Sequence, residues 1–251
     1  IWTKIFEHNL NKKFKVLNAG IGGQTSFGHK SMFNMWFKKL PDLNPKYIIV
    51  YLGINDALYL VENINNPRLL SDGREFNLSN RDILINTRKF DRIIQYMKNN
   101  SVLHDLYLLI KGNILSKKYK VSYNSKPTIF KAYQNSIPNN LHNLDENSIL
   151  EFKTYYFRNL KDIMNNSKNY NSEIIFVTQT ISAEHWLKQY LKKINLFTLS
   201  FCKKQNILCI NLLDNEINLK NENFYDGIHT TPEGSKIIGE YLARKFNNYK
   251  F

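Results

Sequence analysis

The chain has 251 residues, of which 43% are hydrophobic and 14% are aromatic, and this is enough to bury one large core. No apolar run reaches the ~18 residues of a membrane-spanning helix, and no signal peptide is visible, although the sequence starts at Ile1 rather than at a methionine. The formal net charge of +14 would suit nucleic acid or an anionic lipid surface. However, the lysines are scattered among many asparagines and isoleucines, as in proteins from AT-rich genomes, so no nucleic-acid partner is expected.

The first half of the chain predicts strands that alternate with helices. An amphipathic helix is expected from Trp2 to Leu10, a short strand at Phe14–Leu17 and a helix from about Ser26 to Leu40. The continuous apolar run Tyr47–Leu52 predicts a central strand, because a strand with one solvated face would alternate apolar and polar residues.

The second half continues this pattern after one interruption. Strands are expected at 173–178 and 207–212, and helices at 80–99, 148–166, 184–204 and from Pro232 onward. The weakly patterned, Asn- and Ser-rich stretch at about 101–147 is interpreted as an insertion. Strands and helices in alternation predict a parallel sheet covered on both faces, hence a single α/β domain over residues 1–251.

Loops that carry glycine or polar side chains follow the predicted strands. They are the glycine loop before Ser26, Gly53–Asp56, Gln179–Thr180 and the loop that contains Asp226. Ligands of parallel sheets bind beyond the carboxyl ends of the strands, so these loops should meet at one edge of the sheet. Gln179 and His185, which both follow the strand at 173–178, are candidates to touch a substrate there, although packing is the simpler explanation of each.

The segment before the last helix pairs an acid with a histidine. Asp226 precedes His229 by three residues, Thr231 has the chemistry of an N-cap, and Pro232 suits the first position of a helix. A histidine oriented by a carboxylate is what a general base requires. A turn that merely contains both residues is the simpler interpretation of this motif when it is taken alone.

Three motifs in order along the chain resemble the SGNH (GDSL-type) hydrolase family. They are Asn18-x-Gly20-x-x-Gly23-x-Thr25-Ser26, then Gly53-x-Asn55-Asp56 after a strand, and then Asp226-x-x-His229 near the C-terminus. The resemblance covers nearly the whole chain apart from the segment at about 101–147. It implies a three-layer α/β/α, flavodoxin-like fold.

The resemblance also implies an esterase-like site that needs no metal and no cofactor. His229 would be the general base and Asp226 its orienting carboxylate, while the Gly23 N–H and the Asn55 side-chain amide would donate to the oxyanion. Acyl transfer builds negative charge on the former carbonyl oxygen, and fixed donors aimed at that charge contribute roughly 3–4 kcal/mol each.

The sequence departs from the family at its first motif. Gly-Asp-Ser, or a Gly-Ser variant after the first strand, is absent from the chain. Ser26 follows the oxyanion glycine, where the family has no nucleophile, and Ser31 lies inside the next predicted helix. We therefore expect a chain truncated at its N-terminus, with the first strand absent and the nucleophilic serine upstream of Ile1.

The reading that combines these features is a serine-type ester hydrolase that acts on a short, acetyl-like ester of a carbohydrate or a small molecule. An acyltransferase with the same site, a catalytically inactive glycan-binding domain and a basic surface protein are the alternatives. Relatives by resemblance are often exported or membrane-anchored in bacteria, and membrane contact is expected only through an upstream segment. The two cysteines, Cys202 and Cys209, match no metal or redox spacing and leave the compartment open, as the oligomeric state is left open too.

Overall fold

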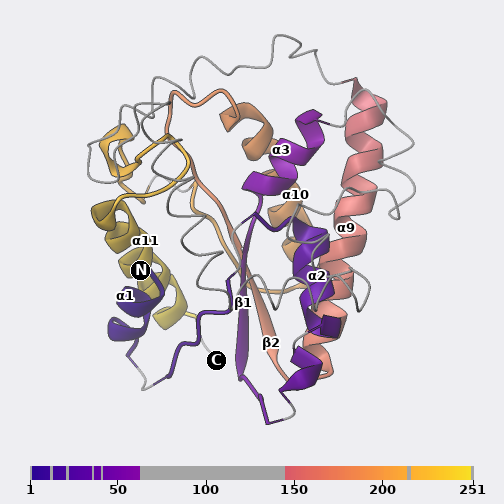
Figure 1. Ribbon diagram of the computed structural model, residues 1–251, viewed down its shortest axis with the longest axis vertical. Coiled ribbons are helices and arrows are strands. Elements are labelled where there is room, and N and C mark those ends of the chain that lie inside the picture. The colour runs from indigo at the N-terminus through magenta and orange to yellow at the C-terminus, as the bar shows by residue number, and fades with distance from the viewer. Residues whose placement is uncertain are drawn as a thin grey trace, which may run out of the picture.

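The computed structural model describes residues 2–11, 14–20, 23–35, 37–40, 42–62, 145–213 and 216–249 (Figure 1). The helix expected at 80–99 and almost all of the segment at about 101–147 lie outside these residues.

The described residues form a three-stranded parallel sheet, which confirms the predicted α/β class. Its strands are β1 (Tyr47–Leu52), β2 (Glu173–Thr178) and β3 (Cys209–Ile210), in that order across the sheet. β1 and β2 pair in register from Tyr47 opposite Glu173 to Leu52 opposite Thr178. β3 is shorter than expected, because the Leu212 N–H donates to the Thr178 hydroxyl at 2.9 Å instead of to a backbone carbonyl.

Helices cover both faces of this sheet, as Figure 1 shows. Successive residues of β2 alternate between two hydrophobic cores: Ile174 and Phe176 face one, and Ile175 and Val177 face the other. This alternation explains the continuous apolar run, because both faces of the strand are buried. The helical segments are α1 (Trp2–His8), α2 (Ser26–Met35), η1 (Phe37–Lys39), α3 (Ile54–Glu62), α9 (Glu146–Lys168), α10 (Lys188–Gln205), η2 (Asn221–Asn223) and α11 (Pro232–Asn247).

Each core lies between the sheet and its own set of helices. The first core lies against α2, α3, α9 and α10, and the second lies against α1 and α11. The result is the predicted arrangement of three layers, helix, sheet and helix. Within the described residues, no helix has the length and apolar character needed to cross a membrane.

The predicted strand at Phe14–Leu17 is wrong. This segment forms no ladder with any described strand, and the Val16 N–H donates to the Glu7 carboxylate at 2.8 Å instead. The Phe14 ring still packs against Tyr47, with ring centroids 5.7 Å apart. Leu17 is 65% exposed, and a strand also needs a partner strand for its backbone.

β1 lies at one edge of the described sheet. The Lys46 carbonyl accepts the Glu173 N–H, so the alternation of a parallel ladder turns the backbone groups of Ile49 and Tyr51 away from β2. In the described part of the chain, the backbone of Ile48–Leu52 forms hydrogen bonds with no segment other than β2. On the side of the second core, Trp2 of α1 packs on the Tyr51 ring, with ring centroids 5.6 Å apart.

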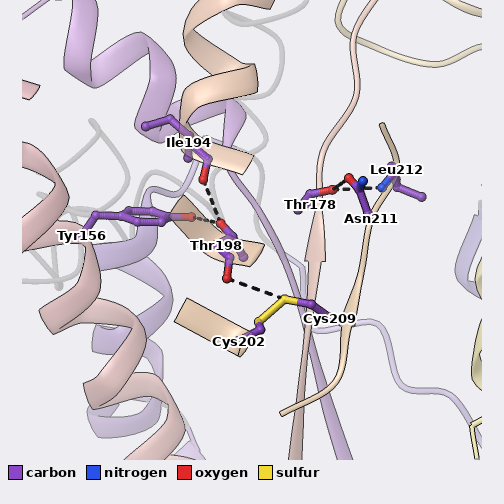
Figure 2. Close-up of a disulfide and its surroundings, with 8 residues drawn as sticks. All are labelled: Tyr156, Thr178, Ile194, Thr198, Cys202, Cys209, Asn211 and Leu212. Atoms are coloured by element: carbon purple, nitrogen blue, oxygen red, sulfur yellow. Dashed lines mark hydrogen bonds between the residues drawn. A yellow bond between two sulfur atoms is a disulfide. The ribbon is translucent and has the colours of Figure 1, made fainter. Parts of the chain in front are cut away.

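A disulfide joins the end of α10 to the start of β3 (Figure 2). It links Cys202 to Cys209, with a Cα–Cα distance of 6.0 Å. Asn206 reverses the chain between them in a left-handed conformation, which asparagine tolerates better than most residues. One helical turn away, the Thr198 and Tyr156 hydroxyls are hydrogen-bonded at 2.8 Å and join α10 to α9.

Reduction of the disulfide should lower the free energy of unfolding by about 2–3 kcal/mol, because the bond closes a short loop in the unfolded chain. Urea unfolding followed by tryptophan fluorescence, with and without dithiothreitol, measures this difference. The double variant Cys202→Ala/Cys209→Ala is the matched control, and dithiothreitol should leave its unfolding unchanged. Detection of two free thiols in the untreated, denatured protein would contradict the assignment.

Candidate active site

The loop that carries Asp226 and His229 is closed at its base by the backbone. Phe224 and Thr230 form an antiparallel bridge, and the Tyr225 N–H donates to the His229 carbonyl at 2.7 Å. The loop leads directly into α11, where the Thr231 hydroxyl accepts the Gly234 N–H as the predicted N-cap. Helix and bridge together hold the two candidate catalytic side chains in one short, constrained segment.

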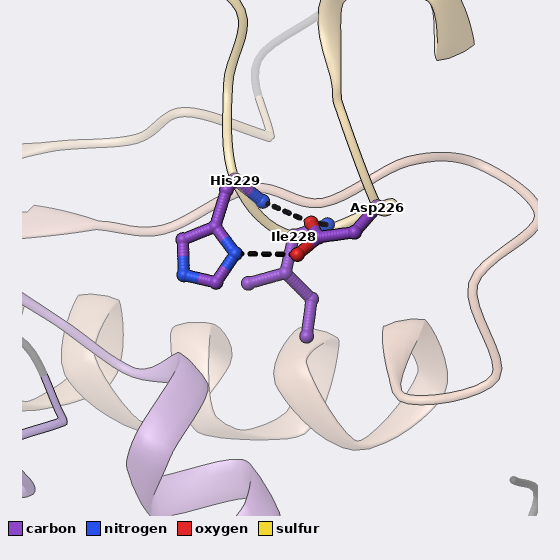
Figure 3. A network of polar contacts seen from close by, with 3 residues as sticks. All are labelled: Asp226, Ile228 and His229. Carbon is purple, nitrogen blue, oxygen red and sulfur yellow. Dashed lines mark hydrogen bonds and ion pairs between the residues drawn. The ribbon is translucent and has the colours of Figure 1, made fainter. Parts of the chain in front are cut away.

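The Asp226 carboxylate organises this loop from within, as Figure 3 shows. One of its oxygens accepts the backbone N–H groups of Ile228 and His229, at 2.9 and 2.7 Å. Its other oxygen lies 2.6 Å from Nδ1 of His229. The His229 side chain is 76% exposed and Asp226 only 14% exposed, so the carboxylate fixes one ring nitrogen and leaves Nε2 accessible.

These contacts shift both pKa values in the directions that favour a charged pair. Burial of the Asp226 carboxyl opposes ionisation, but the hydrogen bonds from His229 and from the backbone outweigh burial and lower its pKa to about 2. The hydrogen bond to Asp226 raises the pKa of His229 above its ordinary value of 6.5, against a smaller effect of burial. Asp226 is therefore ionised at neutral pH and can hold the histidine in a defined orientation.

The two predicted oxyanion donors lie on segments that contact each other. Asn55 is the second residue of α3, and its side-chain amide donates to the Gln24 carbonyl at 3.0 Å. An amide group has two N–H bonds, so a second donor of Asn55 is available. Gly23, next to Gln24, has a φ of +82°, a conformation that favours glycine, and apart from its chain neighbours no described residue has an atom within 4 Å of where a side chain would begin.

The loop after β2 joins this pair of donors to the Asp226 loop. The Gln179 side-chain oxygen accepts the Ile54 N–H at 2.6 Å, at the start of the helix that carries Asn55. Three residues later, the Ser182 N–H donates to the Gly227 carbonyl at 2.8 Å. Ile228 also packs against the core cluster that contains Ile54. Direct hydrogen bonds thus connect the segments that the sequence predicted to meet at one edge.

Gln179 and His185 contact the protein itself. The carbonyl of Gln179 accepts the Asn195 amide at 2.7 Å, in addition to the bond from its side chain to Ile54. His185 is 8% exposed, and its Nδ1 accepts the Leu187 N–H at 3.2 Å. A β-carbon at Gly227 would lie 2.7 Å from the His185 ring, which explains the glycine at that position. Contact of Gln179 and His185 with a substrate stays a prediction.

Sequence reasoning missed the contact that Asp56 makes with a distant segment. The Asp56 side chain is 2% exposed and accepts hydrogen bonds from the backbone and the hydroxyl of Ser26. Ser26 is itself fully buried. Among the described residues, no group of three or more His, Cys, Asp and Glu side chains is arranged to hold a metal ion.

Comparison with known proteins finds no matching family model and no matching curated protein. Among solved structures, the chain is similar to a protein from Desulfitobacterium hafniense DCB-2 that is described as lipolytic and of the G-D-S-L family. The TM-score is 0.49, with 13% identity over 97% of this chain and 86% of that chain. It is also similar to a catalytic mutant of an acetylxylan esterase from Geobacillus stearothermophilus, with a TM-score of 0.49 and 12% identity over 99% of this chain and 80% of that chain. The activity of the present chain must therefore be argued from its own site.

Replacement of Asp226 by asparagine should lower the pKa of His229 toward 6.5, because the charged hydrogen-bond acceptor is lost. An NMR titration of the His229 ring measures the shift.

The pKa shifts of Asp226 and His229 also determine how the stability of the fold depends on pH. Asp226 stabilises the fold above its ordinary pKa of 3.8 and loses this effect as the pH falls toward about 2. His229 stabilises the fold below 6.5 and loses this effect as the pH rises through its raised pKa.

The matched control for this titration is Glu233→Gln. Glu233 lies in the first turn of α11 and near Lys236, so the change removes a nearby negative charge without touching the Asp226–His229 hydrogen bond. The His229 titration should stay near that of the wild type. An unchanged His229 pKa in Asp226→Asn would contradict the assigned pairing.

Proposed function

We propose that this chain belongs to a serine-type ester hydrolase that removes a short, acetyl-like acyl group from a carbohydrate or a small-molecule ester. The observation that carries the proposal is the Asp226–His229 pair, in which a carboxylate holds Nδ1 at 2.6 Å while Nε2 is accessible. Support comes from the chain of hydrogen bonds that links this pair, through the loop after β2, to the segment with Asn55.

In the proposed reaction, a serine hydroxyl attacks the carbonyl carbon of the ester and passes its proton to Nε2 of His229. The carbonyl oxygen becomes an oxyanion that accepts hydrogen bonds from the Gly23 N–H and the Asn55 amide. His229 then gives its proton to the oxygen of the leaving alcohol as the carbon–oxygen bond breaks, and an acyl-serine is left. Water, activated by the same histidine, releases the acid and restores the serine.

The serine reaches the site, in this proposal, on a strand upstream of Ile1 that pairs with the edge of β1 opposite β2. The backbone groups of Ile49 and Tyr51 face that edge and form no hydrogen bond with another described segment. A strand that pairs there in parallel would end at the same edge of the sheet as the loops of Asn55 and Asp226. Its last residue would therefore lie beside the proposed donors and the proposed base.

The full-length protein should hydrolyse p-nitrophenyl acetate without added metal, with a rate that rises with pH as His229 loses its proton. His229→Ala should remove most of the rate, because the serine would have no proton acceptor. Asn55→Ala should lower kcat on the order of 10²-fold with little change in KM, since its donor acts on charge that develops in the transition state. Asp226→Asn should fall between the wild type and His229→Ala.

Asn165→Ala is the matched control for Asn55→Ala, because Asn165 is an exposed asparagine on α9, outside the proposed site. Its kcat and KM should equal those of the wild type. Equal turnover by His229→Ala would overturn the mechanism. A wild-type protein that is inert toward short acyl esters but binds a glycan would support the glycan-binding alternative, and product formed only with a sugar acceptor would support acyl transfer.

A further inference from the structure

A buried carboxylate fastens three helices to one another behind the candidate site. Asp56 is the third residue of α3 and is 2% exposed. Its two oxygens lie 2.9 and 3.0 Å from the backbone nitrogen of Ser26, the first residue of α2, and one of them accepts the Ser26 hydroxyl at 2.7 Å. The Asn159 amide of α9 donates to the same hydroxyl at 3.1 Å.

A second carboxylate–serine pair in this protein shows what such contacts do when they serve only a helix end. Asp145 precedes α9 and accepts the Ser148 N–H at 3.0 Å and the Ser148 hydroxyl at 2.6 Å. That pair spans three residues and Asp145 is exposed, whereas Asp56 and Ser26 are 30 residues apart and buried. Burial of a carboxylate costs free energy unless its hydrogen bonds are satisfied, and the bonds of Asp56 join separate segments.

The segments that Asp56 joins are those that carry the two proposed oxyanion donors. Asn55 is adjacent to Asp56, and Gly23 is three residues before Ser26. The Asn55 amide also donates to the carbonyl of Gln24, a buried residue between Gly23 and Ser26. A shift of the Ser26 end of the Gly23 loop relative to α3 would therefore break the bonds of Asp56 to Ser26.

We propose that Asp56 is a positioning residue, which fixes the spacing between the Gly23 N–H and the Asn55 amide by anchoring Ser26 to the head of α3. Oxyanion donors are effective only when they are held in place before the charge develops. The catalytic consequence rests on the proposed function, whereas the anchoring itself does not. The positional claim is therefore testable without turnover.

The experiment compares Asp56→Asn with Asp145→Asn in the full-length protein by NMR hydrogen exchange. Asparagine keeps the size of the side chain but loses one acceptor oxygen and the charge. In Asp56→Asn, exchange should become at least about tenfold faster at the Ser26 N–H and also at the Asn55 side-chain amide. In Asp145→Asn, exchange should become faster at the Ser148 N–H and stay unchanged at Asn55.

Faster exchange at Ser26 with unchanged exchange at Asn55 would overturn the proposal, because Asp56 would then act only on its own partner. If Asp56→Asn does not fold, Ser26→Ala removes only the hydroxyl bond and keeps the backbone bond. This variant should accelerate exchange of the Asn55 amide to a smaller degree, and no acceleration would equally overturn the proposal.

In the esterase assay, Asp56→Asn should lower kcat about tenfold and leave KM nearly unchanged, since misplaced donors weaken only the transition state. An inert wild type would count against the proposed function and would leave the exchange result standing. An active Asp56→Asn enzyme with wild-type kcat would count against the positioning role even if the ester hydrolase proposal held.

Discussion

The parallel pairing of β1 and β2 is the constraint on which the candidate site depends. β2 is buried on both faces and β1 is partly buried, and their register from Tyr47–Glu173 to Leu52–Thr178 brings their carboxyl ends to the same level. The residues that follow β1 and those that follow β2 therefore lie close together. After β1 the chain turns at Gly53 directly into α3, and after β2 Gln179 accepts the first N–H of that helix. A shift in the register of one strand would separate the two segments.

The loop after β2 connects the sheet to the loop that carries His229. Gln179 is bound to Ile54 at one end of the loop, and Ser182 is bound to Gly227 at the other. The Asp226 loop is thus attached to the sheet through neighbouring backbone as well as through α11. Within that loop, the Asp226 carboxylate meets three N–H groups, of which only the one on the His229 ring has a catalytic meaning. The other two shape the backbone so that the ring stays where the carboxylate can hold it.

Local patterns in the sequence were sufficient for much of the fold. β2 has the predicted bounds because its four consecutive apolar residues, 174–177, are typical of a strand buried on both faces, and α11 begins at Pro232 because its N-cap chemistry is local. The Asp226–His229 contact also follows from residues three apart. By contrast, the strand expected at Phe14–Leu17 was wrong, because a strand needs a partner and no described strand pairs with this segment.

The remaining features depend on contacts between distant residues, which no local pattern encodes. The Ile54 N–H at the start of α3 donates to the side chain of Gln179, which lies 125 residues along the chain, so no local capping pattern predicts this contact. The Asp56–Ser26 contact spans 30 residues, and the pairing of Cys202 with Cys209 requires that the end of α10 meet the start of β3. Gln179 and His185 were recognised as lying near the site, but their protein partners were visible only in three dimensions.

The central claim is that Gly23, Asn55 and His229 act on one reacting group. A crystal structure of the full-length protein after reaction with a small phosphonate ester, which mimics the tetrahedral intermediate on a serine, tests it most directly. The account predicts a phosphonyl oxygen ~3 Å from the Gly23 nitrogen and the Asn55 amide, with Nε2 of His229 in hydrogen-bond reach of the serine oxygen. Side chains of Asn55 and His229 separated by more than about 10 Å in that complex would contradict the account, because one reacting group could not contact both.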